Sequence, residues 1–246
     1  MAAENQEIEI PESIKRILDE VFVPYYGRAL ENLDRVASLI KIGLRTPEQK
    51  ALIKVLGSAE GEKEVVGYDD VLRSAVVLMH AALEDVLRTM ARGTLLLASP
   101  EVLEKTKISL KGLGRGEKFS LWQLAEYRGK TVDDLIHDSV EADLRQTSYN
   151  STGDIAKLLG LLGIDPAPYE LYFSTLEAMI QRRHQIVHWA DRPQSSQQGV
   201  PPIAPIDPVQ VHDWVRAANA FLMKLIQAVG SKQVGDKLRA RGLLVG

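Results

Sequence analysis

Residues 168–190 have the sequence PYELYFSTLEAMIQRRHQIVHWA, in which apolar side chains recur at intervals of three and four residues. On a helix that turns by about 100° per residue, this spacing gathers the side chains on one face. The members of that stripe are Tyr172, Leu176, Met179, Arg183, Val187 and Ala190. The pattern predicts an amphipathic helix whose core-facing side carries an arginine in its middle.

The same spacing runs through most of the chain, and alternating stretches are few, so the sequence predicts an all-α protein. Gly163 and Gly230 are expected to follow helix ends, and Ser151 or Thr152 is expected to cap the helix that includes Ile155. The predicted helices span residues 11–22, 24–44, 46–56, 69–97, 119–128, 131–146, 152–162, 168–190, 209–229 and 231–241.

Two polar segments divide this helical chain. Residues 57–67 (GSAEGEKEVVG) are rich in glycine, and residues 192–208 hold five prolines, so neither is expected to be helical throughout. The second segment could be a simple connector or a lid over the preceding helix. We therefore expect an N-terminal helical extension at 1–60, a main helical domain at 61–230 and a basic C-terminal tail at 231–246.

Composition narrows the classes of function. The 246 residues are 45% hydrophobic, which is enough to build a real core, and a formal net charge of -3 argues neither for nor against nucleic acid. There are no cysteines, which excludes disulfides, thiol nucleophiles and cysteine-ligated metals. The acidic N-terminus and the lack of an apolar run near the ~20 residues of a membrane span favour a cytoplasmic protein, with no membrane partner.

Arg182, Arg183, His184 and His188 form the richest chemical pattern in the chain, near the end of the predicted helix. Arginine binds phosphate through a planar fork and keeps its charge, whereas histidine can exchange a proton near neutral pH. Together these groups could cut RNA without a metal, and no cofactor is expected. Arg182 and Arg192 could contact the RNA backbone or could simply be solvated.

Two other interpretations remain open at this point. In the structural one, Arg183 extends from a helix contact or meets a buried acid such as Glu84, and His188 is a core histidine. In the metal interpretation, His184 and His188 have the spacing of a helical zinc pair, with Asp191 one turn further along. Gln185 stands where a zinc hydrolase of the HExxH type would have its glutamate.

The stretch Met179–His188 resembles the signature of the HEPN superfamily, which is an arginine, a polar residue, three or four variable residues and a histidine. Arg183, His184 and His188 match every motif position. Ala81–Leu87, Asn150–Ser151 and Ile155–Ile164 also resemble the RiboL-PSP branch of that superfamily. Together the similar stretches cover roughly residues 69–229.

This resemblance implies an up-and-down helical bundle and, in many members, a metal-independent endoribonuclease of toxin–antitoxin or antiphage systems. It implies that His188 transfers the proton, that Arg183 stabilises the phosphoryl charge and that His184 supports them. It also implies a homodimer with a composite active site, which suits Arg183 and His188, about 140° apart on one helix. An antitoxin or another defence protein is then a possible partner.

Two further points follow from the resemblance. Members that a nucleotidyltransferase inactivates carry a tyrosine two residues after the histidine, and Ala190 stands there, so that regulation is not expected. Some HEPN domains have lost the nuclease, which leaves a catalytically silent module that binds RNA or nucleotide, or scaffolds a partner protein, as the alternative function.

Overall fold

The computed structural model describes residues 11–43, 67–96, 98, 100–105, 120–193 and 202–243. Every regular element in these ranges is a helix, which confirms the all-α class. The predicted helix at 46–56 lies outside the described residues. None of the described helices is both long enough and apolar enough to cross a membrane.

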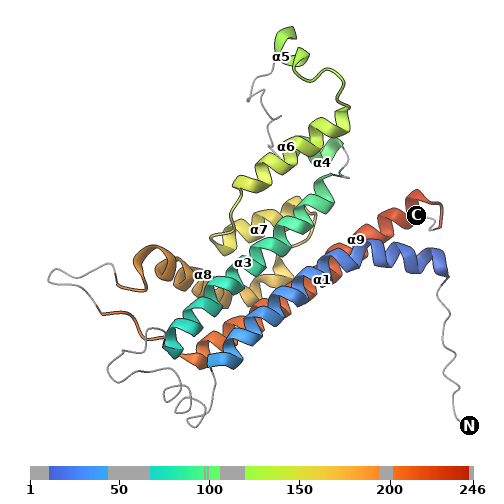
Figure 1. Cartoon of the computed structure of the whole chain (residues 1–246). Helices are drawn as coiled ribbons and strands as arrows, with labels where there is room; N and C mark the ends of the chain where they lie inside the picture. Colours follow the sequence, from blue (N-terminus) through green and yellow to red (C-terminus); the bar gives the residue numbers. More distant parts are fainter. Residues whose placement is uncertain are drawn as a thin grey trace, which may run out of the picture.

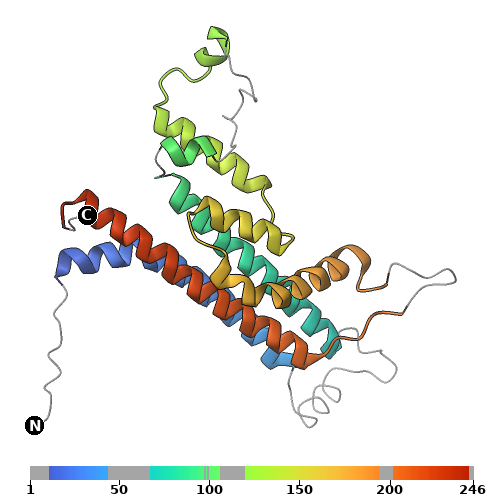
Figure 2. The same ribbon diagram turned by 180° about the vertical axis from the view of Figure 1, so that it is seen from behind.

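Three long helices lie side by side and form the bundle (Figures 1 and 2). They are α1 (Glu12–Gly43), α3 (Tyr68–Leu95) and α9 (Pro208–Ala240). Helix α1 runs antiparallel to the other two, as its polar contacts show: Arg28 Nη1 lies 3.1 Å from Asp85 Oδ1, and the Tyr25 hydroxyl donates to Gln233 Oε1 over 2.9 Å. The N-terminal helix therefore shares one core with the rest of the chain.

Helix α1 passes through Pro24 without ending, so the predicted break between residues 22 and 24 is wrong. Proline removes one backbone donor and crowds the preceding turn, which is why the sequence indicated two helices. Burial outweighs that cost, because Val21, Tyr25 and Ala29 recur at intervals of four on the face that packs against α3 and α9. The helix bends in its N-terminal part instead of breaking (Figure 1).

Helix α9 likewise continues through Gly230, so the predicted helix end there is wrong. A side chain on Gly230 would overlap the ring of Phe22 in α1. The glycine therefore allows close packing between two helices rather than terminating one of them. Residues 231–240 consequently belong to α9, where Lys237 Nζ lies 3.0 Å from Glu20 Oε2 of α1.

Replacing Gly230 by alanine should destabilise the protein by about 1 to 3 kcal/mol, because the new methyl group would force Phe22 and the α1 backbone apart. Gly235→Ala is the matched control in the same helix. Its added carbon would make only ordinary contacts with the Arg239 side chain, so it should leave stability unchanged or raise it by up to about 1 kcal/mol. Urea unfolding of both variants measures the difference, and equal effects would contradict the proposed role of Gly230.

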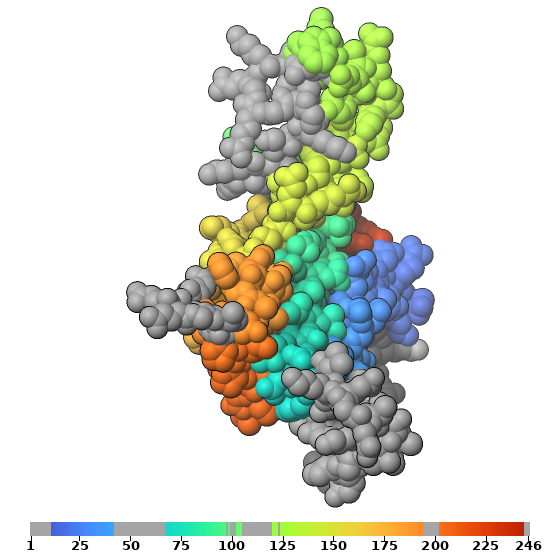
Figure 3. All heavy atoms as spheres, turned by 60° about the vertical axis from the view of Figure 1, so that its left-hand side comes forward, coloured from blue at the N-terminus to red at the C-terminus, as the bar shows by residue number. Residues whose placement is uncertain are grey.

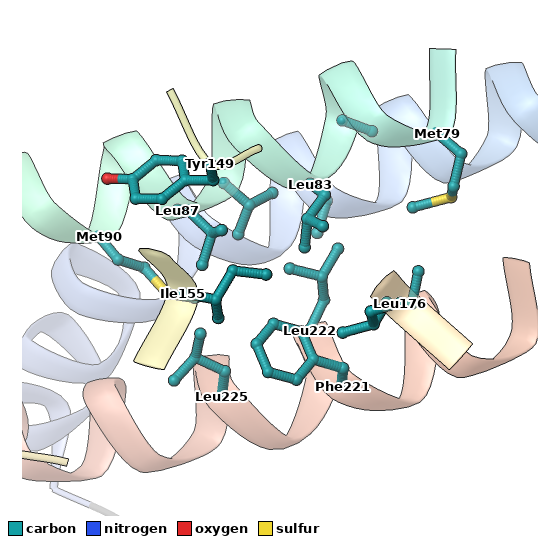
Figure 4. Close-up of a cluster of buried hydrophobic side chains, with 14 of the residues drawn as sticks. Met79, Leu83, Leu87, Met90, Tyr149, Ile155, Leu176, Phe221, Leu222 and Leu225 are labelled. Carbon is teal, nitrogen blue, oxygen red and sulfur yellow. The ribbon is translucent and has the colours of Figure 1, made fainter. Parts of the chain in front are cut away.

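The core lies where α3 and α9 meet two further helices, α7 (Thr152–Leu161) and α8 (Glu170–Trp189) (Figure 4). Fully buried side chains from each of these helices interdigitate there, and they supply most of the stability through the apolar area they remove from water. The labelled members include Met79, Leu83 and Leu87 of α3, Ile155 of α7, Leu176 of α8, and Phe221, Leu222 and Leu225 of α9.

Four shorter helices follow α3 in the described part of the chain; the first three extend the bundle at one end, and the last lies beside α3 (Figure 1). They are α4 (Pro100–Lys105), which the sequence analysis did not predict, α5 (Leu121–Ala125), which is shorter than expected, α6 (Val132–Gln146) and α7 (Thr152–Leu161). The predicted cap of α7 is confirmed, because the Ser151 hydroxyl accepts a hydrogen bond from the Asp154 N–H over 3.2 Å. Gly163, in a left-handed conformation, follows α7 as expected.

The helix that carries the motif, α8 (Glu170–Trp189), follows a short 3-10 helix, η1 (Ala167–Tyr169). The first part of this segment packs on α9, where the rings of Tyr169 and Tyr172 meet Phe221 edge-on at centroid distances of 5.8 and 6.1 Å. The other end of α8 reaches the surface next to α3 (Figure 3). The core thus fixes one end of α8 while the motif lies at the other.

Candidate functional site

Helix α8 ends in a left-handed turn at Ala190 and Asp191, whose φ angles are 49° and 59°. The backbone N–H groups of both residues bond to the carbonyl oxygen of Gln185, which closes the helix. Residues other than glycine adopt this conformation at a cost and keep it only where surrounding contacts impose it. The contacts of Asp191 explain why the turn persists.

Asp191 is 1% exposed and receives two guanidinium groups on one oxygen. Its Oδ2 lies 2.6 Å from Arg73 Nε of α3 and 2.8 Å from Arg182 Nη2 of α8. The same two arginines donate to backbone carbonyls near the end of the proline-rich segment at 192–208: Arg73 Nη2 to Ala204 over 2.8 Å, and Arg182 Nη2 to Pro205 over 2.8 Å. This cluster joins α3, the end of α8 and the start of α9.

These contacts contradict two expectations, one about Arg182 and one about Asp191. Arg182 is neither solvated nor directed at RNA phosphate, because its side chain is committed to Asp191 and Pro205. The zinc interpretation required Asp191 as a third ligand beside His184 and His188. It is contradicted, since Asp191 is buried and both nearby charges on its Oδ2 are arginines.

Arg183, one residue further along, has a different environment. It is half-buried on the side of α8 that faces α3, and its Nε is fully covered without a hydrogen-bond partner among the described residues. The expected pairing with Glu84 is not formed. Glu84 instead accepts from Arg88 Nη2 over 3.1 Å and from the Tyr149 N–H over 2.9 Å. Within the described part of the chain, Arg183 therefore keeps its charge unpaired.

His184 and His188 lie together on the exposed side of α8. Their ring centroids are 4.4 Å apart, at an interplanar angle of 44°, as expected for residues four apart on a helix. His188 is not the core histidine of the structural interpretation. The rings and the Arg183 side chain leave α8 on different sides, so one protomer does not gather all three groups around one point.

Three polar side chains of α3 bind the backbone of the segment that precedes α7. His80 Nε2 lies 3.1 Å from the Tyr149 carbonyl oxygen, and Arg88 donates to the Thr147 carbonyl, so the segment before α7 is fixed to α3 at both positions and at Glu84 between them. Burial raises the pKa of Tyr149 to about 12. No local pattern in the sequence indicates a partner for His80, because the atom that it bonds belongs to the backbone 69 residues away.

Helix α8 is also joined to the start of α7. Glu177 Oε2 accepts from the backbone N–H and the hydroxyl of Thr152, over 2.8 and 2.9 Å. These hydrogen bonds lower the pKa of Glu177 because they favour its charged form. The polar stretch at 145–152 thus caps α7, as Ser151 was expected to do, and also connects α7 to α8.

A pocket of about 480 Å³ lies beside His184, between α8 and α9. Amide side chains, two tryptophans and one histidine line it, and Trp189 among them is exposed. The lining includes Gln181, His184, Gln185, Trp189, Gln210 and Trp214. The surface next to the histidines therefore combines hydrogen-bonding groups with aromatic faces.

The sequence model of a protein family described as RiboL-PSP-HEPN matches residues 45–230, a range that includes α3, α6, α7, α8 and most of α9. No curated protein and no solved structure matched the chain.

Proposed function

Since the chain belongs to the RiboL-PSP-HEPN family, we propose that it is a metal-independent endoribonuclease whose active site contains Arg183, His184 and His188. HEPN domains are often ribonucleases, so membership of the family supports a role that involves RNA. The more specific proposal that the chain cuts RNA depends on the residues of α8. We also propose that it acts as the toxin or effector of a prokaryotic toxin–antitoxin or antiphage system, as the resemblance implies.

The nuclease proposal depends mainly on the different environments of two neighbouring arginines. Arg182 is committed to Asp191, whereas Arg183 has no ion-pair partner among the described residues. A partly buried, unpaired guanidinium is costly unless an anion occupies the site at some stage of function. His184 and His188, which lie next to each other and are exposed on the same helix, could exchange protons beside that anion.

The reaction we propose breaks an RNA chain by internal attack. The 2′-oxygen forms a bond to the adjacent phosphorus while the bond to the 5′-oxygen breaks, which leaves a 2′,3′-cyclic phosphate and a 5′-hydroxyl. One imidazole takes the proton of the 2′-hydroxyl, and a protonated imidazole gives one to the leaving oxygen. Arg183 stabilises the charge on the non-bridging phosphoryl oxygens, and His184 holds the phosphate or His188.

Two copies of the chain would complete this site. Arg183 and His188 project from different sides of α8, so one protomer cannot easily place both on one phosphate. Around a twofold axis, the His188 of one protomer could act as base and that of its partner as acid. The exposed Val187 and Trp189 next to the histidines would be covered in such a dimer.

The alternative is a catalytically silent HEPN-like module that binds RNA or nucleotide, or scaffolds a partner protein. The partial burial of Arg183 against α3 favours it, because a buried arginine can serve packing alone. The two functions differ in whether RNA is cut, which one assay decides.

In that assay, the full chain is incubated with total cellular RNA in EDTA. Fragments with cyclic phosphate ends should appear, because none of the proposed groups requires a metal. An oligonucleotide with a single ribose among deoxyribose units should be cut only after that ribose, and the all-deoxy control should stay intact, because DNA lacks the attacking hydroxyl. Cleavage of the all-deoxy strand would contradict the mechanism, and intact RNA would favour the binding module.

A further inference from the structure

The pocket of about 480 Å³ between α8 and α9 has no role in the proposed reaction, yet His184 of the motif forms part of its wall. A substrate whose phosphate lies at the histidines therefore passes the mouth of this pocket. The parts of an RNA chain nearest to that phosphate are the sugars and bases of the two nucleotides that it joins. The chemistry of the pocket lining indicates which of these parts fits.

The lining comes from two facing helices, and on each helix the residues follow one side. Gln181, Gln185 and Trp189 recur at intervals of four on α8, so they lie along one stripe of that helix. Gln210 and Trp214 have the same interval on α9. Each wall of the pocket thus presents an amide side chain and, one turn further along, an indole ring.

The two indole rings offer surfaces on which a base can stack. Trp214 is buried and belongs to the core cluster, so its ring is fixed in the wall. Trp189 is 47% exposed, although it lies next to the motif at the end of α8. An exposed aromatic ring beside a polar pocket is a typical platform for an unpaired base, because every base has a face that stacks on such a ring.

The amide side chains offer hydrogen bonds to the edge of a base. Gln181 Nε2 donates to Glu177 Oε1 over 2.8 Å, and because a carboxylate can only accept, this bond orients the amide and leaves its Oε1 as an acceptor. The amides of Gln185 and Gln210 form no hydrogen bond within the described part of the chain, and each has both a donor and an acceptor. Neighbouring donors and acceptors are what the edges of unpaired bases present.

A base in this pocket is compatible with the proposed dimer. On a helix, residues two positions apart point in directions about 160° from each other, so Val187 and Trp189 leave α8 on nearly opposite sides. A second copy that covers Val187 and His188 would meet the outer edge of the Trp189 ring. The part of the ring that lines the pocket faces α9 and stays available to RNA.

We propose that this pocket is a base-recognition subsite, in which Trp189 stacks on an unpaired base of the RNA and Gln185 selects that base by hydrogen bonds to its edge. This inference rests on the proposed nuclease, since it assigns the substrate of the same site. Because His184 belongs both to the motif and to the pocket wall, the base belongs to a nucleotide next to the phosphate that is cut. The subsite would give the ribonuclease a sequence preference.

The first experiment measures binding of the full chain to short strands of 2′-O-methyl nucleotides, which cannot be cut because the attacking oxygen is blocked. Each strand carries one of the four bases at its central position only, and a further strand of equal charge carries none. The wild type should bind its preferred base about five- to a hundredfold more tightly than the base-free strand, and Trp189→Ala should lose most of this preference. Binding is followed by anisotropy of a label on the strand.

Trp122→Ala is the matched control, because Trp122 is also an exposed tryptophan but lies on α5, at the end of the bundle (Figure 1). It should keep the wild-type preference. Equal affinity for strands with and without a base would overturn the proposal, and so would equal losses in Trp189→Ala and Trp122→Ala. Free nucleoside monophosphates should bind more weakly than the strands, and equal affinity would indicate a nucleotide site instead of an RNA subsite.

The second experiment measures cleavage of oligonucleotides with a single ribose, in four versions that differ in the base next to the cut. The wild type should cut the best version at least about tenfold faster in kcat/KM than the worst, because a well-placed amide discriminates between bases by such factors. Gln185→Leu keeps the size of the side chain and loses its hydrogen bonds, so it should cut all four versions with differences of about threefold or less.

The two experiments separate this inference from the proposed nuclease. An unchanged preference in Gln185→Leu, or a wild type without any preference, would contradict the role of Gln185 while the nuclease stands. If the wild type cuts no RNA, the proposed nuclease fails, while the binding experiment still decides whether the pocket takes a base.

Discussion

Replacing His188 by alanine should abolish metal-independent RNA cleavage, with a loss of about 10² to 10⁴ in kcat. Alanine removes the exposed imidazole that ends the family signature and to which we assign the proton transfer. The fold should not change, because the His188 ring contacts solvent and the ring of His184 rather than the core. Cleavage of a labelled oligoribonucleotide in EDTA measures the loss, with melting temperature as the check on folding.

His212→Ala is the matched control, because His212 is also an exposed histidine on a helix, in α9. It should cleave RNA at the wild-type rate. If His188→Ala retained full activity while folded, another base would have to act and the assignment of the site would be wrong. The Arg183→Ala variant should also lose at least about 10²-fold in the rate of RNA cleavage. Equal activity in every preparation, this variant included, would indicate a contaminating ribonuclease.

Replacing Asp191 by alanine should cost about 3 to 5 kcal/mol of folding stability, the largest effect we expect from one substitution outside the hydrophobic core. The carboxylate is 1% exposed, and the side chains of Arg73 and Arg182 are only 12% and 18% exposed. Its removal therefore leaves Arg182 without a counterion and leaves Arg73 with only the half-exposed Asp70, which lies 3.0 Å from its Nη1. The left-handed turn at the end of α8 would lose the contact that imposes it. Urea unfolding monitored by circular dichroism measures the loss.

The control for this prediction is Asp213→Ala. Asp213 pairs with Arg216 over 2.9 Å, but their side chains are 50% and 73% exposed, so its removal should cost at most about 1 kcal/mol. Similar effects of the two substitutions would show that the Asp191 cluster is not a buried anchor. Arg182→Ala should follow Asp191→Ala and lose stability, whereas Arg183→Ala should lose activity alone.

The sequence by itself determined the class of fold and the family, because both depend on local patterns. Apolar spacings of three and four predict helices wherever one face is buried, and α6, α7 and α8 begin and end within a few residues of the predicted positions. The cap at Ser151 was predictable for the same reason, since donor and acceptor lie three residues apart. The motif of Arg183, His184 and His188 is local too, and so is the contact between the rings of its two histidines.

Only the tertiary structure decided what Pro24 and Gly230 do. Each residue disfavours a helix locally, yet α1 and α9 continue through them, because close packing between the two helices outweighs an intrinsic preference of about 1 kcal/mol for glycine and about 3 kcal/mol for proline. Packing energy depends on residues more than 200 positions apart in the chain, so no local pattern contains it.

The roles of the two arginines were decided in the same way. In the sequence Arg182 and Arg183 are neighbours of identical chemistry, but about 100° of helical rotation brings one to Asp191 and leaves the other without an ion-pair partner among the described residues. Asp191 lies in the turn after α8, and Arg73, which shares it with Arg182, comes from α3. Whether an arginine forms a structural ion pair or remains available to bind a substrate depends on the residues that the fold places beside it. Those neighbours are set by the tertiary structure.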